Sequence, residues 1–393
     1  MRFVFFCHSL VSDWNHANAH FLRGVTSQLL ATGHDVCVLE SADNWSLRQL
    51  REQCGEGALK AFYATYPQLK STFYDPLSLS LDDTLKDADV VVVHDRNHPA
   101  LISRVGRHHR QAGSAYRLLF QDARHHATLA SDDPRATLLE DYDGVLTSSD
   151  ALKRSYEAFG WARKVWTWHE AADTRVFQPA AESGVRSLDV VWAGNWGNGE
   201  QASGLTEFLI EPVRMLGLHA RIYGSGYPEK ALRQLRAVGI DYSGWLANFC
   251  LPTMFAMGRV TVNVPRSLRR DGLVPTVPTM RVFEALACRI PLVTAPWDDL
   301  DGMFRPGYDF LVAHDCKEMQ RHLTELLADA DYAQQIAEQG YQTVLAKHTC
   351  AHRVEELLAI CNSLGVNEQR VRPETQVVQP RVAAVAPQVS NWF

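Results

Sequence analysis

The sequence predicts an α/β protein of two domains, each built on a doubly wound parallel sheet. Short apolar runs alternate with helical stretches along most of the chain, which is the pattern of consecutive βαβ units. The chain has 393 residues, more than a single hydrophobic core usually serves, and the alternation restarts near residue 188. Apolar residues make up 46% of the chain and charged residues 21%, which is typical of folded globular proteins.

Strands are expected at runs in which nearly every residue is apolar, because a sheet covered by helices is buried on both faces. In the first half these runs are 2–7, 35–40, 89–94, 116–121, 144–149 and 164–169. In the second half they are 188–194, 220–224, 239–244, 259–264, 290–295 and 309–313. Between the strands, helices are expected over 17–32, 99–112, 200–217 and 280–288, and three more over 315–329, 331–347 and 350–363.

The restart of this pattern sets the expected domain boundaries. A first domain is expected over residues 1–173 and a second over 188–349, with a linker over 174–187 between them. A closing helix over 350–365 follows. Residues 366–393 are rich in Val, Pro and Gln without a helical or strand period, so we expect a flexible tail there.

Charge and cysteine content narrow the class of protein. The net charge of -6 does not favour a nucleic-acid-binding protein, which usually carries a basic excess. The eight cysteines are scattered without a Cys-x-x-Cys pair, which favours free thiols in the reducing cytoplasm over disulfides or a zinc site. Every apolar run is too short for a membrane span, so we expect no integral membrane segment.

Candidate ligand-binding residues follow the strands of the second half, because ligands bind at the carboxyl ends of parallel strands. Gly194 and Asn195 begin a Gly-rich segment that leads from a strand into a helix. Such a segment lets backbone amides approach the diphosphate of a nucleotide, although a plain turn explains it equally well. Gly224 and Trp245 follow the next two strands, and a tight turn and core packing would explain them as well.

The most informative segment is 275–296, PTVPTMRVFEALACRIPLVTAP. Thr279 is suited to cap a helix that begins at residue 280. Arg281 and Glu284 lie three residues apart and therefore on one face of the first turn. A carboxylate there can accept the hydroxyls of a ribose, and a guanidinium near a helix start can hold phosphate oxygens. Helix capping with a surface Arg–Glu pair is the competing interpretation.

The run RVFEALACRIPLVTA resembles the donor-binding helix of family-4-like GT-B glycosyltransferases (glycosyl transferases group 1), in the CgeB-like variant. Three other segments agree in order and spacing, namely WAGNW, HEAADTRVFQP and HTCAHRVEELL, so the resemblance covers roughly residues 1–363. It implies two Rossmann-like domains that face a central cleft. It also implies sugar transfer from a nucleoside-diphosphate sugar, which is a donor substrate and not a cofactor, with Glu284 on the donor ribose and Arg281 near the donor phosphates.

Two features differ from the usual pattern of this family. Thr276 stands where a second glutamate is expected, and the segment GNWGNGEQ lacks a lysine. Arg266 and the arginines at 269 and 270 are candidates for the missing positive charge, unless they belong to a solvated loop. Retention or inversion at the sugar carbon therefore stays open.

The resemblance places the acceptor on the first domain. Polar residues after two of its strands are candidates to contact the acceptor, and they are Asn15, His16, Asn18, His20, Asp122 and His125. Histidine is suited to deprotonate an acceptor hydroxyl, because its ordinary pKa lies near neutral pH. We expect His125, or else His16, to be this base. Further candidates are His94 with Asp95 and, near the linker, His169 with Glu170.

We expect no metal ion. An Asp-x-Asp metal site would be the competing arrangement, and such strings occur at 87–89, 141–143, 299–301 and 329–331. The first precedes its strand and the others lie in helices or loops, whereas a site of this kind needs the carboxyl end of a strand. A sugar-nucleotide epimerase and an inactive binding module of the same fold are the competing functions. The acceptor (glycan, protein or small molecule) and the oligomeric state stay open.

Overall fold

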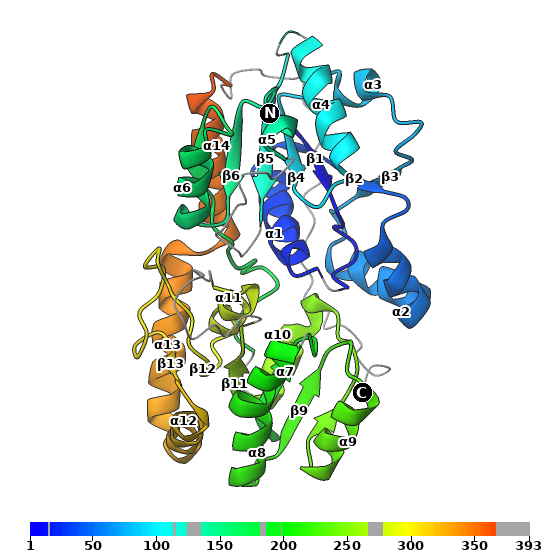
Figure 1. Cartoon of the computed structure of the whole chain (residues 1–393). Helices are drawn as coiled ribbons and strands as arrows, with labels where there is room; N and C mark the ends of the chain where they lie inside the picture. Colours follow the sequence, from blue (N-terminus) through cyan, green and yellow to red (C-terminus); the bar gives the residue numbers. More distant parts are fainter. Residues whose placement is uncertain are drawn as a thin grey trace.

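The computed structural model describes residues 1–14, 16–111, 113, 115–123, 135–180, 186–197, 199–265 and 278–366. Within these ranges the chain forms two parallel sheets, one in each half of the molecule (Figure 1). The first sheet has the order β3-β2-β1-β4-β5-β6-β7 and the second the order β10-β9-β8-β11-β12-β13. In both sheets the chain starts in the middle, builds outward to one edge and then returns to the other side. The predicted fold class, two doubly wound α/β units, is confirmed.

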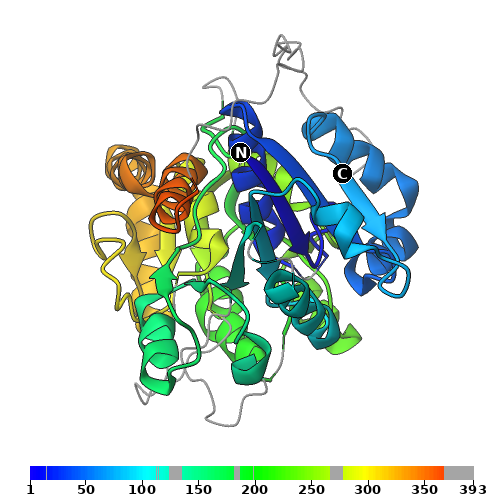
Figure 2. The same cartoon turned by 90° about the horizontal axis from the view of Figure 1, so that it is seen from above.

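The first sheet takes its strands from the first half of the chain. They are β1 (Arg2–Cys7), β2 (Asp35–Ser41), β3 (Ser71–Tyr74), β4 (Val90–His94), β5 (Arg117–Asp122), β6 (Gly144–Thr147) and β7 (Val165–Thr167). The helices between them are α1 (Asn18–Ala31), α2 (Trp45–Thr65), α3 (Leu81–Leu85), α4 (Pro99–Gln111), α5 (Arg135–Leu138) and α6 (Asp150–Phe159). Seen from above, helices lie on both sides of this sheet (Figure 2). The central strands β1 and β4 are accordingly almost wholly buried, as their apolar sequences require.

The second sheet is built in the same way. Its strands are β8 (Leu188–Ala193), β9 (Ala220–Tyr223), β10 (Asp241–Tyr242), β11 (Gly258–Asn263), β12 (Leu292–Thr294) and β13 (Leu311–Val312). Its helices are α7 (Gly199–Leu205), α8 (Glu211–Leu216), α9 (Glu229–Ala237), α10 (Leu251–Met257), α11 (Met280–Ala287), α12 (Cys316–Ala328) and α13 (Ala330–Lys347). No helix in the described ranges combines the length and the apolar character needed to cross a membrane.

The structure contains elements that the sequence did not predict, and one predicted helix is broken. The helix α2 and the edge strand β3 were not predicted: Gly55 interrupts the helix with a φ of 65°, and β3 is partly exposed and thus not an apolar run. The predicted helix 200–217 is broken by a π-helical turn at Thr206–Ile210. Pro212 follows this turn, and it cannot donate the hydrogen bond that a continuous α-helix needs at that position.

The last helix, α14 (Cys350–Ser363), returns to the first domain after α13 has completed the second (Figure 1). It packs against α1, and Trp168 donates from its indole nitrogen to the Arg353 carbonyl at 2.8 Å. A parallel bridge between Ala172 and Thr349 joins the two segments that pass between the domains. The two domains are therefore connected by two neighbouring segments.

Replacing Gly24 by alanine tests the close packing of α1 and α14. A Cβ on Gly24 would lie 2.3 Å from the Cys350 sulfur and 3.0 Å from the Asp173 Cβ, so Gly24→Ala is expected to overpack this contact. Overpacking costs about 1–3 kcal/mol, and urea denaturation should show a lower free energy of unfolding by that amount.

Gly57→Ala is the matched control, because Gly57 lies inside α2 with no atom within 4 Å of its Cβ position. Alanine is favoured over glycine in a helix by roughly 0.5–1 kcal/mol, so the control should keep or raise the stability. Equal stability of the two variants would contradict the close packing.

Candidate active site

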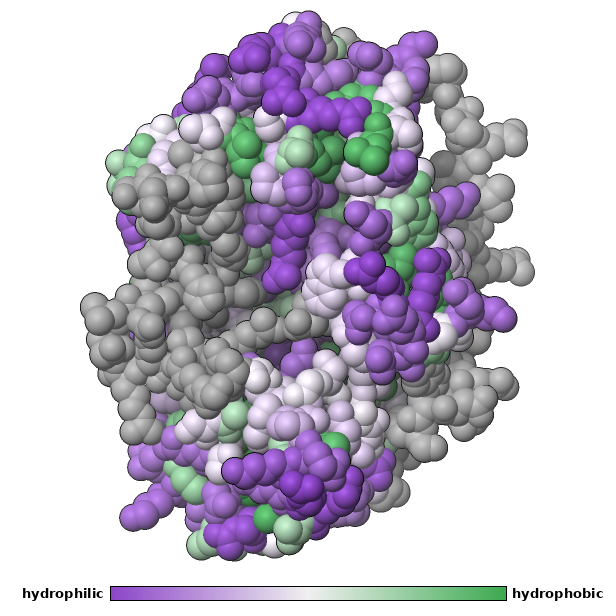
Figure 3. All heavy atoms as spheres, turned by 45° about the vertical axis from the view of Figure 1, so that its right-hand side comes forward, coloured by the Kyte–Doolittle hydropathy of each residue, from purple (hydrophilic) through white to green (hydrophobic). Residues whose placement is uncertain are grey.

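The carboxyl ends of the two sheets face one cavity. In each sheet the strand order reverses beside the first strand, between β1 and β4 and between β8 and β11, and such a reversal opens a crevice for ligands. Residues that follow β1 and β8 line the same cavity, which encloses about 930 Å³ and is partly open to solvent. Figure 3 shows the molecule hollowed between its two halves. A ligand bound in this cavity would touch both domains.

Glu284, on α11, lies in the wall of the cavity although its side chain is only 1% exposed. Its Oε1 accepts hydrogen bonds from the Asn248 side chain and from His20 Nδ1, which is 3.1 Å away. Its Oε2 accepts one from Arg281 Nη1 at 2.5 Å. Because His20 belongs to the first domain and the other partners to the second, this carboxylate joins the two domains.

The charge of Glu284 follows from these partners. Burial raises the pKa of its carboxyl, but Arg281 and the hydrogen bonds from His20 and Asn248 lower the pKa more, so that it lies below its ordinary value. His20 Nε2 accepts the backbone amide of Asp173 at 2.9 Å, which leaves Nδ1 as the nitrogen that donates to Glu284. The site therefore contains a buried carboxylate anion that is held in one orientation.

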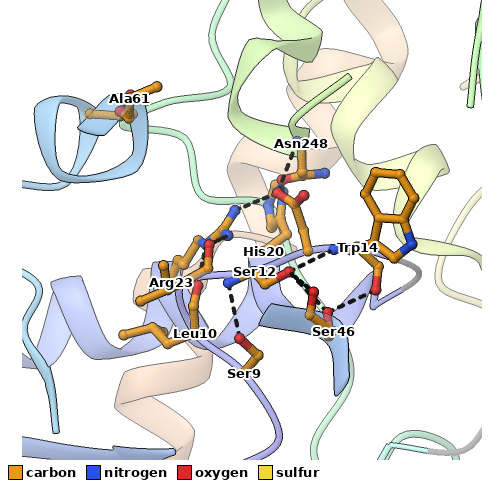
Figure 4. A network of polar contacts seen from close by, with 12 residues as sticks. Ser9, Leu10, Ser12, Trp14, His20, Arg23, Ser46, Ala61 and Asn248 are labelled. Carbon is orange, nitrogen blue, oxygen red and sulfur yellow. Dashed lines mark hydrogen bonds and ion pairs between the residues drawn. The ribbon is translucent and has the colours of Figure 1, made fainter. Parts of the chain in front are cut away.

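The loop after β1 holds the short 3-10 turn Asn248–Cys250 in place. The Asp13 carboxylate accepts the backbone amide of Asn248 at 2.9 Å and Arg23 Nη1 at 2.8 Å. Arg23 is fully buried, donates to two carbonyls of the loop and lies over three aromatic rings, those of Phe62, Tyr66 and Phe249. Figure 4 shows Arg23 and Asn248 at the two ends of this set of contacts. A buried charge in the first domain thus positions a partner of Glu284.

Gly194 and Gly224 bring the loops after β8 and β9 into direct contact. A Cβ on Gly224 would lie 1.8 Å from the Gly194 carbonyl oxygen, so only glycine fits there. The Gly194 amide donates to the Tyr223 carbonyl at 2.9 Å, and Asn195 Oδ1 accepts the Ser225 amide at 3.0 Å. The expectation that the Gly194 amide binds a phosphate is therefore corrected, because this amide holds the two loops together.

The remaining residues that were predicted to bind the donor lie around the start of α11. Trp245 lines the cavity and packs against Trp14 of the first domain, with ring centroids 5.2 Å apart. Thr279 does not cap α11 as predicted, because its hydroxyl donates to Asn263 at 2.9 Å instead. No side chain caps this helix, and Arg281 in its first turn lines the cavity. An uncapped helix start beside a guanidinium favours an anion.

Of the described residues predicted to contact an acceptor, His16 lines the cavity. Asn18, His20 and Asp122 are buried and committed to internal contacts, which corrects the prediction that they meet an acceptor. Asn18 donates to a buried carboxylate at 3.3 Å, Asp122 accepts from a tyrosine hydroxyl at 2.7 Å, and His20 is bound to Glu284. Several predicted features lie outside the described residues, namely Asn15, His125, Arg266, Thr276 and the tail from residue 367.

His16 belongs to a cluster of three histidines, of which His16 and His94 are buried and His8 is half-buried. Its ring centroid lies 5.0 Å from that of His8 and 5.9 Å from that of His94. Neither ring nitrogen of His16 has a hydrogen-bond partner among the described residues. Burial lowers the pKa of all three rings and the charge of Arg96 adds to this, to about 4 for His8, to about 3 for His94 and well below the ordinary value for His16. At neutral pH, His16 therefore presents an uncharged imidazole at the cavity wall.

The sequence and the fold of this chain are similar to those of known glycosyltransferases. Residues 201–359 match the family model described as glycosyl transferase-like. The fold is similar to that of HepE from Anabaena in complex with UDP and glucose, with a TM-score of 0.65 and 14% identity over 92% of this chain and 100% of that chain. Sucrose-phosphate synthase from Thermosynechococcus elongatus gives a TM-score of 0.59 and 14% identity over 93% of this chain and 99% of that chain. No curated protein sequence matches the chain significantly.

The chain has the two-domain GT-B fold of these glycosyltransferases. The region that matches the glycosyl transferase-like family model, residues 201–359, includes α11 with Arg281 and Glu284. A third similar structure is a glycosyltransferase from Rickettsia africae, with a TM-score of 0.64 and 11% identity over 92% of this chain and 98% of that chain. The predicted likeness to the CgeB-like variant is finer than this family model and stays a prediction.

Three aspartates of the Asp-x-Asp strings 299–301 and 329–331 serve local structure. Asp329 caps α13, Asp299 accepts the Phe304 amide at 2.8 Å, and Asp301 accepts the Asp150 amide at 3.0 Å. Asp301 also accepts a hydrogen bond from His169 Nε2, 2.9 Å away, so this predicted candidate near the linker is engaged in a local contact. Over the described part of the chain, no group of three or more His, Cys, Asp or Glu side chains is arranged to hold a metal ion.

Sequence reasoning missed Asp13, Arg23 and Asn248. Asp13 and Arg23 lie within a segment whose histidines and asparagines were the candidates, and nothing in the local pattern shows that an arginine in a helix will be buried. Asn248 lies three residues after Trp245, which was predicted to bind the donor. This proximity was the one feature of the sequence that could have indicated Asn248 as a site residue.

Glu170→Gln tests the buried acid beneath this site. Burial raises the pKa of Glu170 from 4.5 to about 7, against the lowering effect of Asn18. The folded protein therefore holds a proton that the unfolded chain releases, and stability falls as the pH rises through this window. Glutamine mimics the protonated acid, so the variant should match the wild type at pH 5 and exceed it at pH 8 by about 1–3 kcal/mol.

The measurement is urea denaturation at both pH values. The exposed Glu355→Gln is the control and should leave the pH dependence unchanged. A constant difference between Glu170→Gln and wild type from pH 5 to pH 8 would exclude the raised pKa.

Proposed function

We propose that this protein is a glycosyltransferase, which moves a sugar from a nucleoside-diphosphate sugar to an acceptor bound at the first domain, without a metal ion. The observation that carries the proposal is the buried, ionised Glu284 beside Arg281 and the uncapped start of α11, all at one cavity between the sheets. The HepE structure in complex with UDP and glucose supports a nucleotide sugar as the donor class. The free state of all eight cysteines supports a cytoplasmic location.

The donor is proposed to bind through its ribose and its diphosphate. Glu284 Oε1 already accepts two hydrogen bonds, whereas Oε2 accepts one from Arg281 and keeps a second lone pair for a ribose hydroxyl. The diphosphate would lie against Arg281 and the first amides of α11. Trp245 lines the same cavity and offers an apolar face to the nucleobase.

Catalysis would come from the fixed charges around the leaving diphosphate and from a base at the acceptor. As the bond to the sugar breaks, negative charge grows on the diphosphate, and Arg281 with the α11 start stabilises it. His16 is uncharged at neutral pH, has two unpartnered nitrogens and lines the cavity, so it can accept the proton of the attacking hydroxyl. The Arg281 charge takes the part that a metal ion plays elsewhere.

Glu284→Gln is expected to weaken nucleotide binding. The change keeps the shape of the side chain and removes its charge, and a hydrogen bond to a charged group contributes about 1.5–3 kcal/mol. Calorimetric titration with UDP, GDP, dTDP, ADP and CDP should identify the preferred base, with a Kd about 10–100 times higher in the variant. Glu157→Gln, an exposed glutamate on α6, is the control. Unchanged affinity of Glu284→Gln for the preferred nucleotide would overturn the donor site.

His16→Ala is expected to slow the reaction while leaving donor binding intact. A general base contributes roughly 10²–10⁴-fold, so the release of nucleoside diphosphate from the sugar donor should slow by that factor in the presence of acceptor mixtures. The exposed His219→Ala is the control. Release at the wild-type rate in His16→Ala would remove His16 as the base, and product formation without any acceptor would favour an epimerase or hydrolase.

A further inference from the structure

A second cavity lies at the opposite edge of the second sheet, where the strands begin. It encloses about 1300 Å³, including space open to solvent, and it is lined by Arg259 at the start of β11 and Pro291 just before β12. The six residues of β11 span about 16 Å, so this edge is well separated from the cleft that the other end of the strand faces. Nothing in the proposed transfer reaction uses this cavity.

Three arginines line this second cavity, and they are Arg186, Arg259 and Arg289. No described residue that lines it is acidic. Arg259 has Asp189 at 3.4 Å and Arg289 has Glu338 at 3.2 Å, both outside the lining. Among the described residues, Arg186 donates to the Arg259 carbonyl, at the long distance of 3.5 Å, and pairs with no acid. The cavity therefore carries an excess of positive charge.

The three guanidinium groups repel one another electrostatically. Partial burial lowers the pKa of Arg186, and the positive charges of Arg289 and Arg259 lower it further. Like charges gathered around one space raise the free energy of the empty cavity, and an anion placed among them would relieve this repulsion.

The backbone conformation of Arg289 is unusual, and it also favours a role for this side chain in binding an anion. It follows α11 with a φ of 52°, the one positive φ among the described residues that are not glycine. The Arg289 amide bonds to the Leu286 carbonyl and the Ile290 amide to the Ala285 carbonyl, which is the helix ending that normally places glycine at this position. A left-handed conformation costs an L-residue about 1–2 kcal/mol, so the arginine is kept here against the local preference of the backbone.

The rest of the lining is mostly apolar. It includes Phe255 and Pro252 from α10, Ile290 and Leu326. A concave space of this size with apolar walls and a few convergent polar groups fits a small organic ligand better than a peptide or a protein surface. Guanidinium forks bind phosphate oxygens in pairs, which makes phosphate the matching anion.

We propose that this arginine-lined cavity is a second ligand site that binds a phosphate-bearing molecule with an apolar part. The phosphate lies among Arg186, Arg259 and Arg289, and the apolar part lies against Phe255 and the neighbouring aliphatic side chains. Both a free phosphomonoester and the headgroup of a phospholipid have this chemistry.

Arg289→Gly gives the sharpest test, because glycine suits the positive φ and removes the guanidinium at the same time. Isothermal titration of the full chain with glycerol 3-phosphate should show at least a tenfold loss of affinity in Arg289→Gly and in Arg186→Ala. Pyrophosphate, which the donor cleft would also bind, is titrated in the Arg281→Ala background, and there each of the two changes should cause the same loss. The melting temperature of Arg289→Gly should equal or exceed that of the wild type, and its UDP affinity should not change. Arg233→Ala, on the exposed face of α9, is the matched control.

Arg281→Ala separates this site from the donor cleft, because it should weaken nucleotide binding and leave glycerol 3-phosphate binding at the second cavity. Sedimentation with phosphatidylcholine vesicles, with and without phosphatidic acid, distinguishes the sources. Binding only to vesicles with phosphatidic acid, lost in Arg289→Gly, would assign a lipid headgroup, and binding only of the free phosphates would assign a small metabolite. If Arg289→Gly and Arg186→Ala bind all four probes as the wild type does, or if the wild type binds none of them, the proposal is wrong.

Discussion

The carboxylate of Glu284 is the charge around which the two domains are arranged. An anion withdrawn from water is costly unless it is hydrogen-bonded and paired, and Glu284 satisfies this requirement with partners from both domains. Arg281 comes from its own helix, Asn248 from a neighbouring turn and His20 from the first domain. The relative position of the domains and the ionisation of this buried acid are therefore parts of one arrangement. Moving α1 away would leave Oε1 with one partner fewer and would raise the pKa of this carboxyl.

A second buried charge supports the first. Arg23 has no contact with the cavity, yet it fixes the loop that carries Asp13, and Asp13 fixes the backbone of Asn248. The guanidinium is buried between aromatic rings and fully occupied by carbonyl and carboxylate acceptors, so it has a single orientation. A network of this kind is rigid because each member would lose a hydrogen bond if it turned. The site is thereby ordered before a ligand arrives.

The sequence predicted well those features that depend on local pattern, and poorly those that depend on contacts between distant segments. Continuous apolar runs located the central strands, because burial on both faces leaves no other pattern. The three-residue spacing of Arg281 and Glu284 placed both on one face of α11, and the structure pairs them there. By contrast, Gly194 was expected to offer its amide to a ligand, and the pairing that prevents this is with Tyr223, at the end of a strand 29 residues away. His20 was likewise predicted to contact the acceptor. Its partner Glu284 lies 264 positions further along the sequence, and no local sequence pattern can indicate a contact over that separation.

The chain passes between the domains twice, and the two passages are bonded side by side. The Ala172 amide donates to the His348 carbonyl and the Cys350 amide to the Ala172 carbonyl, each at 2.9 Å. A single connecting segment would let the two domains rotate freely relative to each other. Two connecting segments that are hydrogen-bonded to each other prevent the domains from twisting or sliding and leave one axis about which they can bend. If the cleft widens, the domains would therefore rotate about the two connecting segments. Their separation would change least near these segments and more with distance from them. Such a motion would separate the neighbouring rings of Trp14 and Trp245, because each domain carries one of them.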